Sequence, residues 1–261
     1  MHQQRVKALS TLAFVAVLAV AVTAYATNSW GGYHWARKSN PFTLKLGNNL
    51  SSSWQTYLSL ASSDWSRSTV LHTSIIAGNT SPRRCGATAG LVEVCNYTYG
   101  NTGWLGIASI SLQSGTLHIT QGTVKLNDTY FNQAQYNTPA WRRMVACQEI
   151  GHTFGLDHQD TNFNNTNLGS CMDYTNSPGG GGTYGPANTS PNTHDYNELV
   201  TIYSHADSST TIGAPTPVAV AARTDGDDEL PAEVVANRYK SFVEDLGNGE
   251  QRVSYVFWAP R

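Results

Sequence analysis

The sequence is poor in charged side chains, and this scarcity excludes one broad class of partner. Asp, Glu, Lys and Arg make up only 13% of its 261 residues, well below the roughly 25% of an average soluble domain. The formal net charge is −2, so no basic field is present to attract a polyanion. We therefore expect no nucleic-acid partner.

Other signatures are missing too. The sequence has no internal repeat, no G-x-S-x-G motif to mark a serine nucleophile, and no C-x-x-C pair to mark a four-cysteine zinc site. Beyond residue 26, no apolar run reaches the roughly 20 residues that a membrane-spanning helix needs. A serine hydrolase, a cysteine-rich zinc module and a multi-span membrane protein are therefore disfavoured.

The longest apolar run lies at the N-terminus, from Ala8 to Val22, behind the positive charges of Arg5 and Lys7. The small-x-small sequence Ala24-Tyr25-Ala26 follows it and is typical of a signal-peptide cleavage site. The alternative, an uncleaved membrane anchor, is weakened by the shortness of the run. We expect residues 1–26 to be a signal peptide. The mature protein is then secreted and extracellular, without stable membrane insertion.

Four cysteines suit an oxidising compartment and allow three disulfide pairings. We favour Cys85–Cys95, which closes a short loop, together with Cys147–Cys171. A loop of the second size stabilises a fold by about 3 kcal/mol in the chain-entropy model. The alternative is a set of free buried thiols, which an extracellular location disfavours.

Apolar periodicity predicts an α+β fold in which strands precede a long helix. Alternating or β-branched segments predict strands at residues 41–46, 69–76, 91–99, 103–112 and 116–126. Helical spacing predicts helices at 53–66, with possible caps at 51–53, then between Thr138 and Gly155, and at about 195–204. Thr138 would cap the second helix, Pro139 fits its first position, and Gly155 permits a left-handed end.

The end of that helix carries a metal-binding pattern, Gln148-Glu149-Ile150-Gly151-His152-Thr153-Phe154-Gly155-Leu156-Asp157-His158. Residues 148 and 152 are four apart, so both side chains leave one helical face and can bind one metal ion. The turn at Gly155 returns His158 as a third ligand. Three protein ligands leave a fourth position for water, as in catalytic zinc sites. The metal lowers the pKa of that water, and Glu149 can take its proton as general base.

This spacing resembles the H-E-x-x-H-x-x-G-x-x-H signature of the metzincin clan of zinc endopeptidases, with Gln148 in place of the first histidine. Downstream, Ser170-Cys171-Met172-Asp173-Tyr174 resembles the methionine turn of that clan. The resemblance implies that Met172 lies beneath the metal. It also implies that Tyr174 binds the metal or steadies the transition state, as in the astacin and serralysin branches.

The resemblance further implies a metzincin-like zincin domain, with a twisted mixed sheet, an active-site helix, a Met-turn and a C-terminal helix. An edge strand at 103–112 would align extended substrate through its backbone. We expect this catalytic domain at 27–206, a Ser/Thr/Pro linker at 207–219 and a C-terminal extension at 220–261. The extension carries a predicted hairpin that turns at 247–249.

The expected function is thus that of a secreted, monomeric zinc-dependent endopeptidase acting on protein or peptide substrates. An amide oxygen is a weaker zinc donor than imidazole, so alternatives to Gln148 as a ligand stay open. Zinc could be held by His152 and His158 alone, with Tyr174 or solvent, or His118 or His194 could replace the missing ligand.

Two other classes of function stay open. The site could belong to a non-catalytic extracellular zinc-binding module, or the polar, Trp-containing composition could be that of a carbohydrate-binding adhesin. Asp157 and Asp160 are candidate hydrogen-bond partners of the ligating histidines, or plain surface acids. We interpret His72, His118 and His205 as incidental, apart from the alternative given for His118.

Overall fold

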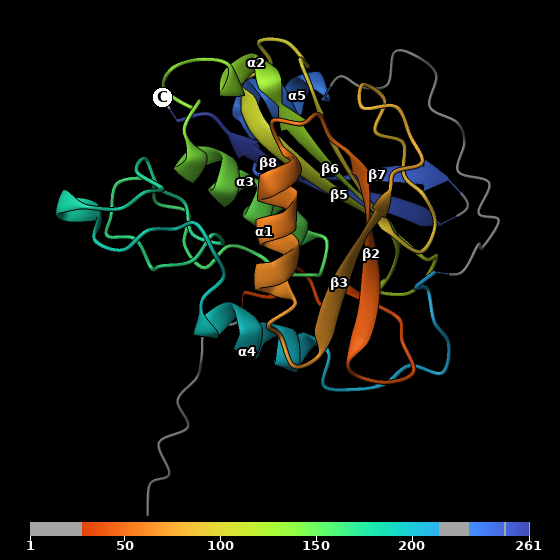
Figure 1. Cartoon of the computed structure of the whole chain (residues 1–261). Coiled ribbons are helices and arrows are strands. Elements are labelled where there is room, and N and C mark those ends of the chain that lie inside the picture. Colours follow the sequence, from red (N-terminus) through yellow and green to blue (C-terminus); the bar gives the residue numbers. More distant parts are fainter. Residues whose placement is uncertain (1–27, 214–229, 248, 261) are drawn as a thin grey trace, which may run out of the picture.

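The computed structural model describes residues 28–213, 230–247 and 249–260. Its strands are β1 His34–Trp35, β2 Phe42–Asn49, β3 Leu71–Ala77, β4 Val92–Tyr97, β5 Trp104–Leu112, β6 His118–Asn127, β7 Ser241–Gly247 and β8 Glu250–Trp258. They form one mixed sheet in the order β3-β2-β4-β6-β5-β8-β7, with β1 paired to β6 off this path (Figure 1). The expected signal peptide and residues 214–229 of the expected linker and extension lie outside the described residues.

The helices are α1 Gln55–Trp65, α2 Asp128–Phe131, α3 Pro139–His152, α4 Thr193–Ile202 and α5 Ala232–Asn237, with a 3-10 turn η1 at Gly182–Tyr184. The α1 and α3 helices lie on the same face of the sheet (Figure 1). The Trp65 indole N–H donates to the carbonyl oxygen of Cys147 at 3.0 Å, which joins these two helices. Among the described helices, none has the length and apolar character to span a bilayer.

The expected elements are confirmed to within a few residues, including the α+β class and the C-terminal hairpin. The Thr138 hydroxyl accepts the Trp141 amide at 3.3 Å, with Pro139 at the start of α3 as expected. The expectation of a serine cap on α1 is wrong. That helix begins after Trp54, whose buried indole donates to Asp128 instead.

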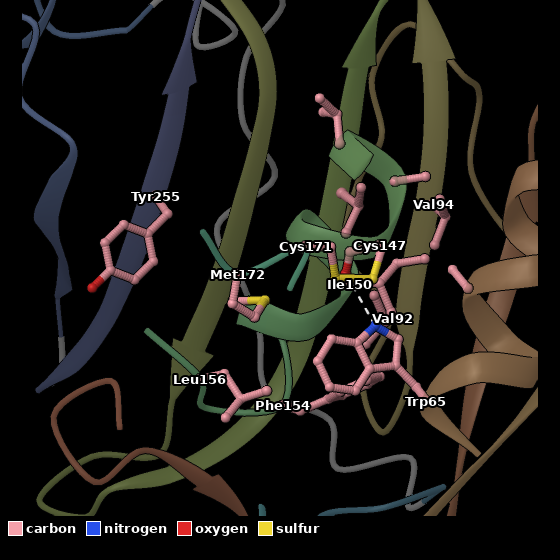
Figure 2. Packing of buried hydrophobic residues seen from close by; sticks show 14 of the residues in the cluster. Trp65, Val92, Val94, Cys147, Ile150, Phe154, Leu156, Cys171, Met172 and Tyr255 are labelled. Carbon is pink, nitrogen blue, oxygen red and sulfur yellow. Dashed lines mark hydrogen bonds between the residues drawn. A yellow bond between two sulfur atoms is a disulfide. The ribbon is translucent and has the colours of Figure 1, made fainter. Parts of the chain in front are cut away.

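The main core fills the space between the sheet and the helices α1 and α3. Its largest fully buried side chains include Trp35, Trp54, Trp65 and Phe154. Figure 2 shows the Cys147–Cys171 disulfide beside Trp65 within this core. Both expected disulfides, Cys85–Cys95 and Cys147–Cys171, are present.

The C-terminal hairpin continues the sheet. Strand β8 runs antiparallel to β5 from the pair Trp104↔Trp258 to the pair Leu112↔Gln251. The expectation that β5 offers a free edge is therefore wrong in this structure, because β8 occupies it.

The composition of β8 explains this position, because both of its faces are apolar and side chains alternate along a strand. Val253, Tyr255 and Phe257 join the main core, whereas Val256 and Trp258 join a second cluster on the other face. That second cluster is completed by Trp104, Ile107 and Val234 of α5. A strand buried on both sides needs neighbours in a sheet and cannot remain a solvated tail.

Candidate metal centre

The residues of the expected metal site gather at the C-terminal end of α3 and the turn that follows it. Gln148 and Glu149 are 0% exposed, His152 is 1% exposed and His158 is 9% exposed. Helical spacing places the first three on the last two turns of α3. Gly155 then reverses the chain and brings His158 back toward His152.

The structure brings the two histidines together through their Nε2 atoms, which lie 3.0 Å apart. His152 Nδ1 lies 2.8 Å from the carbonyl oxygen of Leu156, and His158 Nδ1 lies 3.2 Å from Asp157 Oδ1. Each of these two oxygens accepts a hydrogen bond from Nδ1, so the ring proton of each neutral histidine lies on Nδ1. Both Nε2 atoms therefore present lone pairs to the space between the two rings. Burial lowers the pKa of His158. Burial and, to a smaller extent, the neighbouring charge of His158 lower the pKa of His152 far below its usual range.

Three further polar groups here lack hydrogen-bond partners within the described part of the chain. They are Gln148 Oε1, both carboxylate oxygens of Glu149 and the Tyr174 hydroxyl. The Gln148 amide group donates to the carbonyl oxygen of Cys171 at 2.7 Å, which leaves Oε1 as its unused acceptor. Buried polar atoms are normally paired, so this concentration of unpaired acceptors indicates a site that binds something.

Glu149 lies in a dry position between α3 and β5. A Cβ atom added to Gly106 would come within 2.8 Å of Glu149 Cγ and Oε1, so only glycine fits at that point of β5. Burial raises the pKa of Glu149 well above its usual range. The backbone amide of Ala108 faces the Glu149 carboxylate but does not form a hydrogen bond of normal geometry with it. It therefore offsets only part of the increase in the pKa of Glu149.

The segment 170–174 forms a tight turn against α3. Met172 is fully buried, and its Sδ atom would lie 2.7 Å from a Cβ added to Gly151. The Cys147–Cys171 disulfide fastens this turn to the helix one residue before Gln148 (Figure 2). Packing and a covalent link therefore hold this turn against α3, and Met172 packs against Gly151 of that helix.

Tyr174 and Asp157 both reach the histidine pair. The Tyr174 ring centroid lies 4.3 Å from the ring centroid of His158. Burial and, to a smaller extent, the charge of Glu149 raise the pKa of Tyr174. Burial alone would raise the pKa of Asp157. Hydrogen bonds with His158 and with Tyr255 outweigh that effect and lower it to about 2. Of the two alternatives left open for Asp157, this contact favours the hydrogen-bond partner of His158.

The other candidates lie elsewhere. The Asp160 carboxylate accepts the amide of Asn162 and the side chain of Asn165, which favours the alternative of a plain surface acid. His118 lies beside His34 and Asp207. His194 begins α4, next to Asp195 and Glu198. These placements do not support His118 or His194 as the missing ligand.

The C-terminal hairpin covers the site, which the sequence did not reveal. The Tyr255 ring on β8 lies 4.4 Å from His152 and 5.0 Å from His158, measured between ring centroids. Phe257 lies 4.8 Å from Tyr174, and Lys240 Nζ lies 5.4 Å from the same tyrosine ring. The sequence contains one sign of this position, the alternating apolar residues Val253, Tyr255 and Phe257. It does not indicate which strand they would pack beside.

Gly155→Ala is expected to destabilise the fold. Gly155 has φ +94°, and an added Cβ would collide with the backbone carbonyl oxygen of Tyr33. The left-handed conformation alone costs an L-residue about 1–2 kcal/mol. Urea unfolding should therefore give a loss of free energy above that value. Gly100→Ala is the matched control, since Gly100 has φ +91° with nothing within 4 Å of the added atom. If the two variants lose equal free energy of unfolding, the predicted collision with the Tyr33 carbonyl oxygen is contradicted.

Comparisons with known proteins give little further guidance. No family model matches the chain, and no curated protein matches it. Among solved structures, the chain is similar to one described as "Structure of myroilysin", with 11% sequence identity and a TM-score of 0.36. The likeness covers 68% of this chain and 98% of that chain. At this level it transfers no function, so the chemistry has to be argued from the site itself.

Proposed function

We propose that the chain is a secreted zinc-dependent endopeptidase. The observation that carries the proposal is the pair of buried imidazole Nε2 atoms 3.0 Å apart, beside the unpaired acceptors of Gln148 and Glu149. Two nitrogen donors and an oxygen donor, from the end of α3 and the turn after it, suit a zinc ion with an open fourth position. The expected signal peptide and the two disulfides agree with an extracellular location.

Gln148, His152 and His158 would hold the ion. Gln148 would use Oε1, because its amide nitrogen is engaged with Cys171. The hydrogen bonds that the two imidazoles donate from Nδ1 to the Leu156 carbonyl oxygen and the Asp157 carboxylate would orient both rings. When bound, zinc supplies a Lewis acid that polarises a peptide carbonyl and lowers the pKa of water.

The remaining chemistry belongs to the side chains around this set. Glu149 would accept a proton from the attacking water and pass it to the leaving amine, and its raised pKa brings it closer to neutral pH for that task. The unpaired Tyr174 hydroxyl is the donor available to the oxygen of the scissile carbonyl as charge develops there. The apolar walls formed with Trp30 and Phe163 limit access of bulk water.

Access to the site depends on the hairpin. An extended peptide adding to β5 would take the position that β8 holds in this structure. The proposed activity therefore requires β8 to leave β5, and the closed arrangement is the resting form of the enzyme. The catalytic domain at 27–206 then works with the extension beyond the linker as its cover.

The direct test is hydrolysis of casein and of fluorogenic peptides by the purified secreted chain, with and without a chelator. We expect slow cleavage that the chelator abolishes and that added zinc restores. Zinc binding with no cleavage, even when β8 is loosened by substitution, would favour the alternative of a non-catalytic zinc-binding module. The buried state of the site is the observation that keeps this alternative in view.

Gln148→His is expected to strengthen zinc binding, because imidazole is a better zinc donor than an amide oxygen. We expect a gain on the order of tenfold in affinity, which corresponds to about 1.4 kcal/mol. Competition with a chromogenic chelator measures it. Gln133→His places a histidine at an exposed position and serves as control. A Gln148→His chain that binds zinc more weakly would contradict the proposed ligand set.

A further inference from the structure

Away from the candidate metal centre, the structure brings three histidines and one aspartate together from distant segments. His34 lies on β1, His118 begins β6, and His205 and Asp207 follow the end of α4. The pairing of β1 with β6 places His34 opposite His118. The side chains of His34 and Asp207 are each only 9% exposed.

All three imidazoles direct Nε2 at the same carboxylate oxygen. Asp207 Oδ1 lies 3.3 Å from His118 Nε2 and 3.6 Å from the Nε2 atoms of His34 and His205. His34 Nε2 and His205 Nε2 are 3.2 Å apart. Donors that share one zinc ion at about 2.0–2.1 Å lie roughly 3–4 Å from one another. The separations among His34 Nε2, His205 Nε2 and Asp207 Oδ1 fall in that range.

Two other polar atoms of the cluster, His34 Nδ1 and Asp207 Oδ2, are already engaged. His34 Nδ1 lies 2.9 Å from the carbonyl oxygen of Gly32, which calls for the ring proton there and leaves Nε2 with its lone pair. Arg37 contacts Asp207 Oδ2 through Nη1 at 2.8 Å and through its backbone amide at 3.1 Å. The carboxylate is thereby fixed with Oδ1 toward the histidines.

The contact between His34 and His205 can also be a hydrogen bond, in which His205 Nε2–H donates to the lone pair of His34 Nε2. That arrangement leaves the lone pair of His34 Nε2 facing Asp207 Oδ1 with no proton between them. A cation, in contrast, would satisfy the converging lone pairs and the carboxylate oxygen at once.

We propose that His34, His205 and Asp207 form a second metal site that takes a divalent transition-metal ion such as Zn²⁺. Two nitrogens and one oxygen would hold the ion and leave a fourth position for water. The ion would fasten β1 to the segment after α4, while His118 of β6 contacts the same Asp207 oxygen. The site shares no ligand with the pair His152 and His158.

The position of this site gives the ion a supporting role. The segments that supply its ligands also hold the turn after α3 through two hydrogen bonds. The Trp35 indole N–H donates to the Thr153 carbonyl oxygen at 2.8 Å, and the Tyr203 hydroxyl donates to the Phe154 carbonyl oxygen at 2.9 Å. Fastening these segments steadies the turn that carries His158. Loss of the second ion should therefore lower thermal stability.

The test is the number of Zn²⁺ ions bound per chain, measured by atomic emission after zinc loading and gel filtration of the secreted protein. His205→Ala is expected to bind one ion fewer than wild type and to have a lower Tm. His72→Ala removes an exposed histidine elsewhere and is expected to change neither value. The variant His152→Ala/His158→Ala, which lacks the first centre, is expected to keep one ion and to gain Tm when zinc is added.

A His205→Ala chain that binds as many ions as wild type overturns the second site, as does a double variant that binds none. If His205→Ala fails to fold, Asp207→Asn is compared in its place, and the zinc-dependent Tm of the double variant decides independently. If the first centre binds no metal, wild type carries one ion and His205→Ala none. The two proposals therefore fail separately.

Discussion

Glu149→Gln is expected to reduce kcat/KM for peptide hydrolysis by about 10²–10⁴-fold, the usual contribution of a general base. Glutamine keeps the size and shape of the side chain beside Gly106, so the packing between α3 and β5 is preserved. It cannot accept the proton of the attacking water. Bound zinc should stay constant, because Glu149 is not one of the proposed ligands. Initial rates on a fluorogenic peptide, together with metal analysis, measure both quantities.

The matched control for this variant is Glu198→Gln. Glu198 on α4 is also a buried glutamate with a raised pKa caused by burial, and one of its oxygens is likewise unpaired within the described residues. Its substitution should leave the rate unchanged. Chelator-sensitive cleavage that survives in Glu149→Gln would remove the proposed mechanism while leaving a metal site intact.

Tyr255→Ala/Phe257→Ala is expected to raise the activity of the full chain by tenfold or more. These two rings carry the contacts of β8 with His152, His158 and Tyr174. Truncation of a buried aromatic side chain costs about 3–5 kcal/mol in a core. A loss of only 1.4 kcal/mol in hairpin docking would raise the open fraction tenfold. The measurement is kcat/KM for a peptide substrate, with circular dichroism to confirm folding.

Val243→Ala provides the comparison for the hairpin variant. Val243 lies on β7 in the same hairpin, but it is 56% exposed and pairs with Val253 rather than with Tyr255 or Phe257. Its substitution should not change the activity. A folded Tyr255→Ala/Phe257→Ala chain with unchanged or lower activity would show that β8 is a fixed part of the enzyme and that substrate enters by another route.

The elements with strong local signals could be predicted from the sequence. Thr138, Pro139 and Gly155 mark the ends of α3 through capping chemistry that depends only on neighbouring residues. The spacing from 148 to 158 likewise places the site at the end of that helix, because helical geometry fixes which side chains share a face. The disulfides follow from simple loop closure.

Long-range contacts could not be predicted in the same way. The strand β8 pairs with β5, although about half of the sequence separates them. The alternation of residues within a strand does not indicate which other strand it will pair with. His118 and His205 look incidental in the sequence because 87 positions separate them, and only the folded chain brings them to Asp207. Both misjudged features depend on tertiary structure rather than on spacing.

The meeting of Trp30 and Tyr255 above His152 has a consequence for biosynthesis. These rings lie 4.2 Å apart, one from the first described turn and the other from the last strand. Since the ribosome delivers a polypeptide from its N-terminus, both imidazoles emerge well before the strand that shields them. A newly made chain therefore has an interval in which a cation can enter from solvent. If the proposed function holds, metal uptake by the folded chain needs β8 to leave β5, so it should be slower than uptake during synthesis.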